Sequence, residues 1–447
     1  MDHKHAIVVG GSIGGLLAAR VLTSYFNQVT ILDRDTFPEV GDHRRGVPQG
    51  RHAHGLLAGG RAALEELLPG LSDEMVAAGA IRADIVHRGR WFQAGGLLAQ
   101  FPSDLDGVLI SRPLIEGLIR RRVFALEKVA VRANCVVEDL AFSEDRQRVT
   151  GVRVGGETLG ADLVVDATGR GSHSPQWLAA AGYDKPAEET VRVDVAYTTR
   201  CFYRKGSELN GDLAVILPPT PEGKRSGVLL ALEGGRWICT LVGFFGISAP
   251  QELPGFIEFS RTLPWPDIHE VLTRAEPLGD AAVARFPASL RRRYDRLRRF
   301  PDGLLVFGDA ISSFDPIYGQ GMTVAAMEAL QLDKSLAQGF VSLARRFFER
   351  AGRVVDTPWE IAVGGDLRIP ETEGPRSAKV SFINWYLDRM NRAGQRDPEL
   401  ALAFHRVANL LAPPPSILHP RVVARVLRAG LGRAPETRPR AQAAAGY

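Results

Sequence analysis

Apolar runs and an amphipathic segment alternate at the start of the chain. Residues 5–9 are the apolar run H-A-I-V-V, a glycine-rich turn follows, and residues 16–22 are rich in Ala and Leu. Residues 28–32, Q-V-T-I-L, form the next apolar run. Strand, tight turn, helix and strand within about 30 residues is the pattern of a βαβ unit. The sequence therefore predicts an α/β fold built on a Rossmann-like parallel sheet.

Two later apolar runs also end in turns that carry polar residues. Residues 161–165 precede D-A-T-G, and residues 303–307 precede G-D. Open α/β sheets bind ligands at the carboxyl ends of their strands. The three turns together predict a ligand site at one edge of the sheet.

The middle of the chain has a different pattern. Residues 189–285 contain several β-rich runs separated by turn residues, which predicts an inserted, largely antiparallel substrate domain with further strands at 81–100. The parallel-sheet domain would then consist of residues 1–80, 101–188 and 286–355. We expect a C-terminal helical region at 356–432 and a disordered tail at 433–447, which is rich in Ala, Arg and Pro.

Composition narrows the class of protein. The 447 residues are 45% hydrophobic and 24% charged, as in folded globular proteins, and the net charge of +4 is too small to indicate nucleic-acid binding. The three cysteines are far apart, so neither a disulfide framework nor a metal site is expected. The sequence shows neither a secretion signal nor a long apolar span, and we expect a cytoplasmic protein without a transmembrane segment.

The turn G-G-S-I-G-G at residues 10–15 matches two patterns. As G-x-G-x-x-G it places Gly10, Ser12 and Gly15 at a dinucleotide pyrophosphate, and Asp33, 18 residues after Gly15, at the ribose. As G-x-S-x-G it makes Ser12, between Gly10 and Gly14, the nucleophile of a serine hydrolase. A hydrolase needs an oxyanion N–H from an earlier strand loop, and only one strand precedes this turn. The dinucleotide interpretation is therefore favoured.

The late motif follows the run L-L-V-F. Asp309 of G-D-A is placed to bind a polyol hydroxyl. F-D-P-I-Y-G-Q-G-M-T then leads into good helix formers, so residues 319–323 would present backbone N–H groups at a helix start.

Taken together, the three motifs resemble the FAD-dependent monooxygenases of the aromatic-hydroxylase class over about residues 5–345. The segments at 44–57, 164–172 and 314–322 look most like bacterial polyketide epoxidases of polyether biosynthesis, and squalene epoxidase is a more distant relative. The resemblance implies non-covalent FAD, with NAD(P)H as a transient reductant.

The resemblance also implies roles for individual residues. Gly10, Ser12, Gly14 and Gly15 would line the FAD pyrophosphate, and Asp33 would hold the adenosine ribose. The remaining cofactor-binding residues would be Arg34 and Arg45 beside the cofactor, Arg112 and Asp309 at the phosphates and ribityl chain, Pro316 and Gly319 beside the isoalloxazine ring, and the N–H groups of Gly321, Met322 and Thr323 at its N1/C2 carbonyl edge.

The implied reaction uses NAD(P)H, O2 and a flavin C4a-hydroperoxide, with FAD itself carrying the chemistry. Epoxidation of an alkene in a hydrophobic polyketide or isoprenoid-like substrate is the favoured activity, since an alkene needs no general base. Phenol hydroxylation, prenyl-chain reduction and serine hydrolysis at Ser12 stay as alternatives. Halogenation is disfavoured because L-P-W-P-D-I at 263–268 contains one tryptophan where W-x-W-x-I-P has two.

Some conspicuous residues have plain structural interpretations. His52 and His54 are expected in a hydrogen-bonded surface loop, and the arginines of 291–299 in a solvated connection. Trp91, Phe202, Phe244 and Phe245 are expected to be core residues more than cavity walls.

Overall fold

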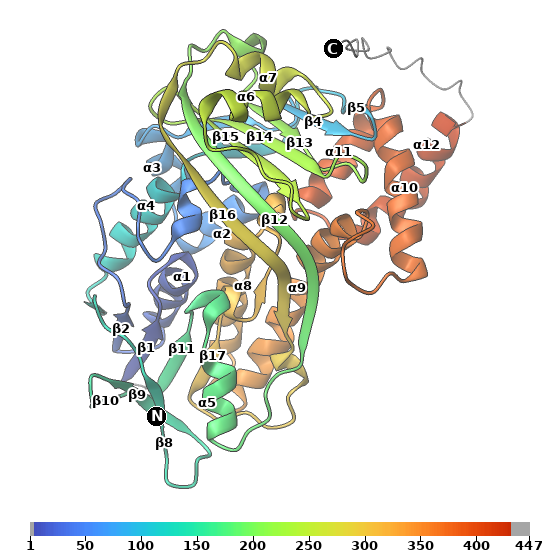
Figure 1. Ribbon diagram of the computed structural model, residues 1–447. Coiled ribbons are helices and arrows are strands. Elements are labelled where there is room, and N and C mark those ends of the chain that lie inside the picture. Colours follow the sequence, from blue (N-terminus) through green and yellow to red (C-terminus); the bar gives the residue numbers. More distant parts are fainter. Residues whose placement is uncertain (1–3, 431–447) are drawn as a thin grey trace.

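The structure is a computed structural model and describes residues 4–430 (Figure 1). Its first sheet has five strands, all parallel to their neighbours, with β1 at the centre. The strand order is β17 (Leu304–Val306), β11 (Leu163–Asp166), β1 (His5–Val9), β2 (Gln28–Leu32) and β7 (Val129–Arg132). Residues 6–9 and 163–166 are buried, as expected of strands covered on both faces. The predicted α/β fold with a Rossmann-like sheet is confirmed.

Helices cover this sheet and form one continuous core with it. α1 (Ile13–Leu22) is buried on nearly all sides, between α4 (Arg112–Phe124) and α8 (Gly321–Leu336). The flanking helices are α2 (Ala58–Leu67), α3 (Leu71–Ala77), α5 (Ser174–Ala180) and α9 (Leu343–Asp366). Because α1 and α8 pack together, the turns that begin them lie at the same end of the domain.

A second sheet of eight strands occupies the upper part of Figure 1. Its strand order is β18 (Ser312–Ser313), β16 (Pro277–Arg292), β12 (Glu188–Tyr203), β15 (Arg236–Phe244), β14 (Arg225–Leu232), β13 (Ala214–Leu217), β4 (Gly89–Gln93) and β5 (Gly96–Leu97). Neighbouring strands are antiparallel except β13 and β4. The expected antiparallel sheet is present.

The two long strands β12 and β16 pair over most of their 16 residues each and connect the two halves of the molecule (Figure 1). Near the upper end of this sheet, α6 (Leu253–Arg261) and α7 (Asp267–Leu272) bury Phe256, Phe259 and Ile268 against strand residues such as Trp237. This apolar core fixes the sheet as a rigid wall.

Two small sheets complete the strands. β8 (Asp139–Phe142), β9 (Val149–Val154) and β10 (Glu157–Gly160) form an antiparallel sheet at the lower end of the molecule (Figure 1). β3 (Ile81–Asp84) pairs with β6 (Asp106–Leu109).

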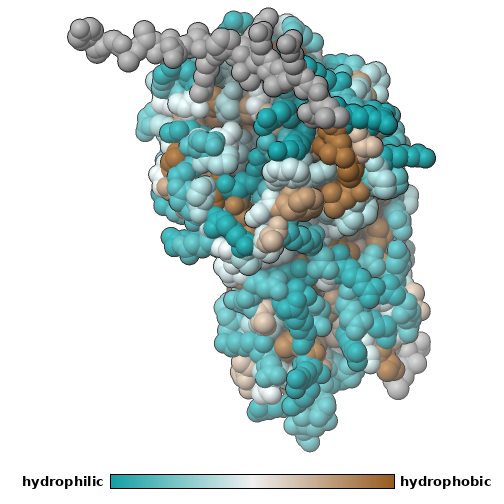
Figure 2. All heavy atoms as spheres, turned by 90° about the vertical axis from the view of Figure 1, so that its right-hand side faces the viewer, coloured by the Kyte–Doolittle hydropathy of each residue, from teal (hydrophilic) through white to brown (hydrophobic). Residues whose placement is uncertain are grey.

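The C-terminal helices α10 (Ala378–Gly394), α11 (Pro398–Ala408) and α12 (Pro420–Gly430) pack beside β4 and form a core of their own. Figure 2 faces this side and shows brown apolar groups among teal polar ones in its upper half. Exposed apolar residues of these helices include Phe382, Trp385 and Leu427. The predicted tail at 433–447 lies outside the described residues. Within residues 4–430, no helix combines the length and the apolar character that crossing a membrane requires.

Candidate active site

One cavity of about 1350 Å³ lies between the two sheets and the C-terminal helices. Its wall combines the three strand-end turns predicted from the sequence with residues of the antiparallel sheet. The predicted site residues that line it are Ser12, Gly14, Arg34, Arg112, Asp309, Pro316, Gly319, Gly321 and Met322. The fold therefore brings together residues that are up to about 300 positions apart in the sequence.

The turn between β1 and α1 has glycines because the backbone leaves no room for side chains. Gly10 has φ +102°, and a Cβ there would lie 2.5 Å from the Ala167 carbonyl oxygen. A Cβ on Gly15 would lie 1.8 Å from the Gly10 oxygen. A Cβ on Gly14 would meet only the Phe307 ring, at 3.6 Å, which is an ordinary contact. Gly10 and Gly15 thus shape the turn and leave the α1 N–H groups open to an anion.

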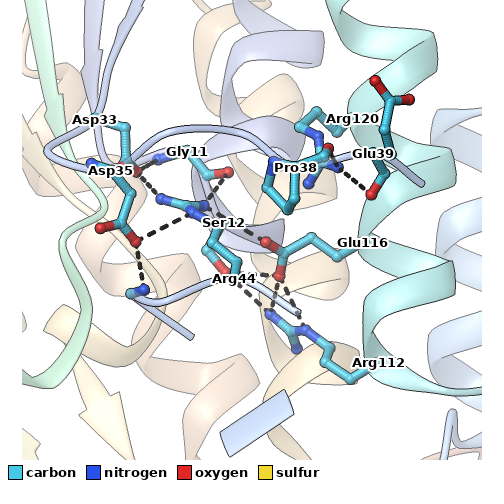
Figure 3. Close-up of polar contacts among 11 residues, drawn as sticks. Gly11, Ser12, Asp33, Asp35, Pro38, Glu39, Arg44, Arg112, Glu116 and Arg120 are labelled. Atoms are coloured by element: carbon cyan, nitrogen blue, oxygen red, sulfur yellow. Dashed lines mark hydrogen bonds and ion pairs between the residues drawn. The ribbon is translucent and has the colours of Figure 1, made fainter. Parts of the chain in front are cut away.

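Ser12 is the N-cap of α1 and its hydroxyl belongs to a buried polar network (Figure 3). The hydroxyl donates to Glu116 Oε2 at 3.1 Å and accepts from Arg112 Nη2 at 3.0 Å. The Arg112 guanidinium also pairs with Glu116 at 2.8 Å. These partners do not include a histidine that could act as a base for Ser12, so the arrangement does not resemble a serine hydrolase.

Asp33 ends β2 and its carboxylate is buried and fully engaged (Figure 3). It accepts the N–H of Gly11 at 2.6 Å and the N–H of Asp35 at 2.8 Å, and it forms an ion pair with Arg44. The Arg44 guanidinium also donates to the Gly11 carbonyl oxygen at 2.9 Å. Arg45, the neighbour predicted beside the cofactor, is exposed, whereas Arg34 lines the cavity.

Asp309 projects into the cavity from the turn after β17, opposite two arginines. Loss of contact with bulk water raises the pKa of the Asp309 carboxyl above its ordinary value, and the positive charges of Arg112 and Arg170 oppose this rise. Behind the turn, the buried Glu328 of α8 accepts the Gly308 N–H at 2.8 Å. Burial raises the pKa of Glu328 to about 8. A protonated Glu328 thus ties α8 to the G-D turn.

The start of α8 is open toward the cavity. Gly319 has φ +64°, and Gln320 is the N-cap without a side-chain hydrogen bond to the helix. Within the described residues, the buried Gln320 Oε1 and Thr323 Oγ1 have no hydrogen-bond partner, and the first turn of α8 contains no acidic residue. Free N–H groups at a helix start stabilise negative charge on a bound group.

His52 and His54 line the cavity, so the expected surface loop is wrong for both residues. His52 is buried, with Nδ1 2.8 Å from Thr199 Oγ1 and its ring beside Tyr197. Burial lowers the pKa of each histidine to about 4, so both rings are neutral at pH 7. The loop lies inside because β12 and β15 cover it, which the local sequence does not indicate.

The far part of the cavity is lined by apolar residues together with charged ones such as Arg88, Lys379, Asp388 and Arg392. Its lining comes from the antiparallel sheet and the C-terminal helices and includes Trp91, Ile216, Val228, Ile383, Leu387 and Phe404. Phe202 and Phe244 are fully buried core residues, as expected, whereas Trp91 is a cavity wall. The apolar residues of this lining suit a hydrophobic ligand.

Comparisons with known proteins identify the family. The chain is 35% identical over 430 residues to Protein Rv3254 of Mycobacterium tuberculosis, which covers 91% of this chain and 90% of that protein. It is 28% identical over 368 residues to a kynurenine 3-monooxygenase of Salinispora arenicola, covering 74% of this chain and 72% of that enzyme. The chain therefore belongs to the same family as Protein Rv3254. No protein-family model matches it.

Solved structures of flavin-dependent and monooxygenase enzymes share the fold. The flavin-dependent brominase Bmp2 superimposes with a TM-score of 0.66 at 15% identity, over 91% of this chain and 93% of its own. The p-nitrophenol 4-monooxygenase PnpA of Pseudomonas putida superimposes with a TM-score of 0.62 at 17% identity, over 91% of this chain and 99% of its own. At such identities the likeness shows the fold alone.

The site fits a flavin, the cofactor of the brominase that shares the fold. The starts of α1 and α8, Arg112 and the buried Gln320 Oε1, which has no hydrogen-bond partner among the described residues, all lie at one cavity. Sequence reasoning missed Arg44 and Glu116, which complete the polar network. Glu116 had a signal, since it follows Arg112 by four residues on a predicted helix. Arg44 had none beyond its place next to Arg45.

Proposed function

We propose that this monooxygenase uses NAD(P)H and O2 to epoxidise an alkene in an elongated, hydrophobic substrate. The observation that carries the proposal is the lining of the cavity. The same cavity is lined by the starts of α1 and α8 and by apolar residues of the antiparallel sheet and the C-terminal helices. A flavin at the two helix starts would therefore present its ring to a substrate that contacts the apolar residues.

The predicted cofactor-binding residues take the roles that the family resemblance implies. Gly10, Ser12, Gly14 and Gly15 hold the pyrophosphate at the α1 N-terminus, and Arg112 neutralises its charge. Asp33 binds the ribose, which requires the Arg44 guanidinium to release the Asp33 carboxylate. Asp309 accepts hydroxyls of the ribityl chain. Pro316 and Gly319 lie beside the ring, and the N–H groups of Gly321, Met322 and Thr323 stabilise negative charge at its edge.

FAD, when bound, would supply the redox chemistry, with NAD(P)H as the reductant and O2 as the oxidant. The chain itself positions the substrate and keeps water away. Its apolar walls, such as Trp91 and Phe404, serve both purposes. An alkene requires no deprotonation before oxygen transfer, so epoxidation needs no further group from the protein.

Hydroxylation of a phenol or aromatic amine is the second candidate. Tyr197, His52 and His54 line the cavity, and Tyr197 donates a hydrogen bond to the Asp315 carboxyl at 2.8 Å. A tyrosine that is hydrogen bonded to a carboxyl group can take part in removing a proton from an ionisable substrate. The similarity to kynurenine 3-monooxygenases is in keeping with this candidate.

Purified protein tests the proposal in two steps. It should be yellow and release unmodified FAD on denaturation. Colourless protein that cannot be reconstituted with FAD would contradict the proposal. The holoprotein is then given NADPH or NADH, ¹⁸O2 and a panel of polyene and phenolic substrates. An epoxide with one ¹⁸O atom supports epoxidation, and a labelled hydroxyarene as the only product supports the second candidate. Saturated product without ¹⁸O would indicate a prenyl-chain reductase.

Ser12→Gly separates flavin binding from hydrolysis in the same preparation. The variant restores the usual fingerprint glycine and should keep FAD binding, because a smaller residue still permits close approach of the pyrophosphate. An esterase activity that is present in the native protein and lost in Ser12→Gly would contradict the assignment of this turn.

A further inference from the structure

Two buried aspartates lie close together at the cavity, and one of them, Asp315, is part of its wall. Asp315 precedes Pro316 in the segment between β18 and α8, and Asp366 is the last residue of α9. Both side chains are 1% exposed, and the two carboxyl groups are close enough for each to change the pKa of the other. Segments about 50 residues apart in sequence thus place two acids at one point.

Each acid also has a tyrosine partner that lines the cavity. The Tyr197 hydroxyl, from β12, donates to Asp315 Oδ1 at 2.8 Å, and this oxygen also accepts the Ile317 N–H at 3.1 Å. The Tyr318 hydroxyl donates to Asp366 Oδ1 at 3.0 Å. Within the described residues, Oδ2 of both aspartates receives no N–H or O–H.

Two carboxyl groups in this position cannot both be ionised without a large electrostatic cost. Burial raises the pKa of Asp315 to about 6 and raises the pKa of Asp366 further above its ordinary value, with the neighbouring Asp315 adding to the rise. Near neutral pH the pair therefore holds one proton, mainly on Asp366.

The other charged or titratable groups around the pair are few. Tyr197 and Tyr318 have pKa values raised by burial and by both aspartates, and the charge of Arg368, after α9, lowers the pKa of Tyr318. The His52 ring packs against Tyr197, 5.9 Å between centroids, and is neutral at pH 7. The described residues thus provide no close cation that would keep both aspartates ionised.

We propose that Asp315 and Asp366 are a proton store for the reaction cavity and that Tyr197 is the residue through which the proton passes. The role of this proton in the reaction rests on the proposed monooxygenase function, whereas the existence of the shared proton does not. Asp315 and Asp366 act through Tyr197 and are positioning residues in this scheme.

The proposed reaction consumes one proton in each turnover, which such a store could supply. In epoxidation, one alkene, one O2, one NAD(P)H and one proton give one epoxide, one water and NAD(P)⁺. Tyr197 would give its hydroxyl proton to the oxygen that leaves as water, while the proton held mainly by Asp366 moves through Asp315 to Tyr197. The pair, then without a proton, would recover one from solvent between turnovers.

Infrared difference spectroscopy tests the shared proton directly, because only a protonated carboxyl has the C=O stretch of a carboxylic acid. Glu328→Gln serves as the background, since it removes another buried acid whose pKa is raised. The part of the carboxylic-acid band that comes from Asp315 and Asp366 should lose about half of its intensity as the pH rises through about 6. The other half should remain at pH 7.5. Adding Asp366→Asn should abolish the band at pH 7.5.

Two tyrosine variants provide a matched comparison that does not depend on Asp366→Asn folding. The Tyr197 hydrogen bond lowers the pKa of Asp315, so Tyr197→Phe should move the step near pH 6 to higher pH. Tyr318→Phe removes the hydrogen bond to Asp366 and should leave that step in place. Absence of any acid band at pH 7.5 in the Glu328→Gln background would overturn the proposal.

The pathway is tested with FAD-loaded protein that is photoreduced and mixed with O2. Without substrate, reduced flavin, O2 and a proton give oxidised flavin and hydrogen peroxide. Tyr197→Phe should slow this step roughly tenfold or more and remove its solvent deuterium effect, with FAD affinity unchanged. Tyr318→Phe should keep both. Slowing by Tyr318→Phe instead would overturn the role of Tyr197, and failure to bind FAD would reject the proposed function while the infrared result stood.

Discussion

At the scale of single residues, Asp309 is the acid that most directly faces the predicted cofactor. Asp309→Ala removes a charged acceptor, and a hydrogen bond of this kind is worth about 1.5 to 3 kcal/mol. We therefore expect FAD affinity to fall roughly ten- to a hundredfold, measured by fluorescence titration of the apoprotein. Asp302→Ala, at an exposed acid just before β17, is the control and should bind FAD like the native protein. Equal affinities of all three proteins would remove Asp309 from the site.

Glu328, the buried acid of α8 behind the G-D turn, should make the free energy of unfolding fall as the pH rises. Its pKa is about 8 in the folded protein and near 4.5 when exposed, so folding favours the neutral form. The stabilisation is complete below pH 4.5 and is lost as pH rises toward 8. Glu328→Gln stays neutral and keeps an acceptor for the Gly308 N–H. Urea titrations should show that the free energy of unfolding of Glu328→Gln, minus that of the native protein, rises between pH 5 and 8. A difference that stays constant over this range would show that Glu328 is already ionised in the folded protein.

At the scale of elements, the turn that joins β1 to α1 contains two neighbouring glycines with different surroundings. Gly15→Ala would force a Cβ into the Gly10 carbonyl oxygen, and such overpacking destabilises by about 1 to 3 kcal/mol or more. Gly14→Ala meets only ordinary contact with Phe307 and adds a better helix former, so it should be neutral or slightly stabilising. Thermal unfolding of the apoproteins compares them, and equal melting temperatures would contradict the close approach at Gly15.

At the scale of the whole molecule, the cavity joins segments from distant parts of the chain, so FAD should stabilise them together. Hydrogen exchange with and without FAD should show slower exchange in peptides that cover residues 10–15, 112–116 and 308–323. The sheet β8–β10 does not contribute to the cavity wall and provides the internal control. Equal protection of β8–β10 would indicate global stabilisation, and protection of residues 10–15 alone would mean that the ligand does not reach α8.

The sequence determined much of this protein because several of its constraints are local. Alternation of apolar runs and turns predicted the parallel sheet, and the β-rich middle predicted the antiparallel one. Gly10 and Gly15 could be read from the chain since their backbone conformation and close contacts are needed within one turn. Asp309 and the start of α8 followed from their positions at a strand end and a helix start, which local pattern also reveals.

Only the tertiary structure decided which polar groups meet. His52 faces the cavity because β12 covers its loop, and Arg44 rather than Arg45 reaches Asp33 because of how the loop after β2 folds back. Asp315 and Asp366 form a pair because α9 ends behind the segment that precedes α8. Burial then sets the protonation of these groups. Desolvation and neighbouring charge act through space and not along the chain, so no local pattern in the sequence contains them.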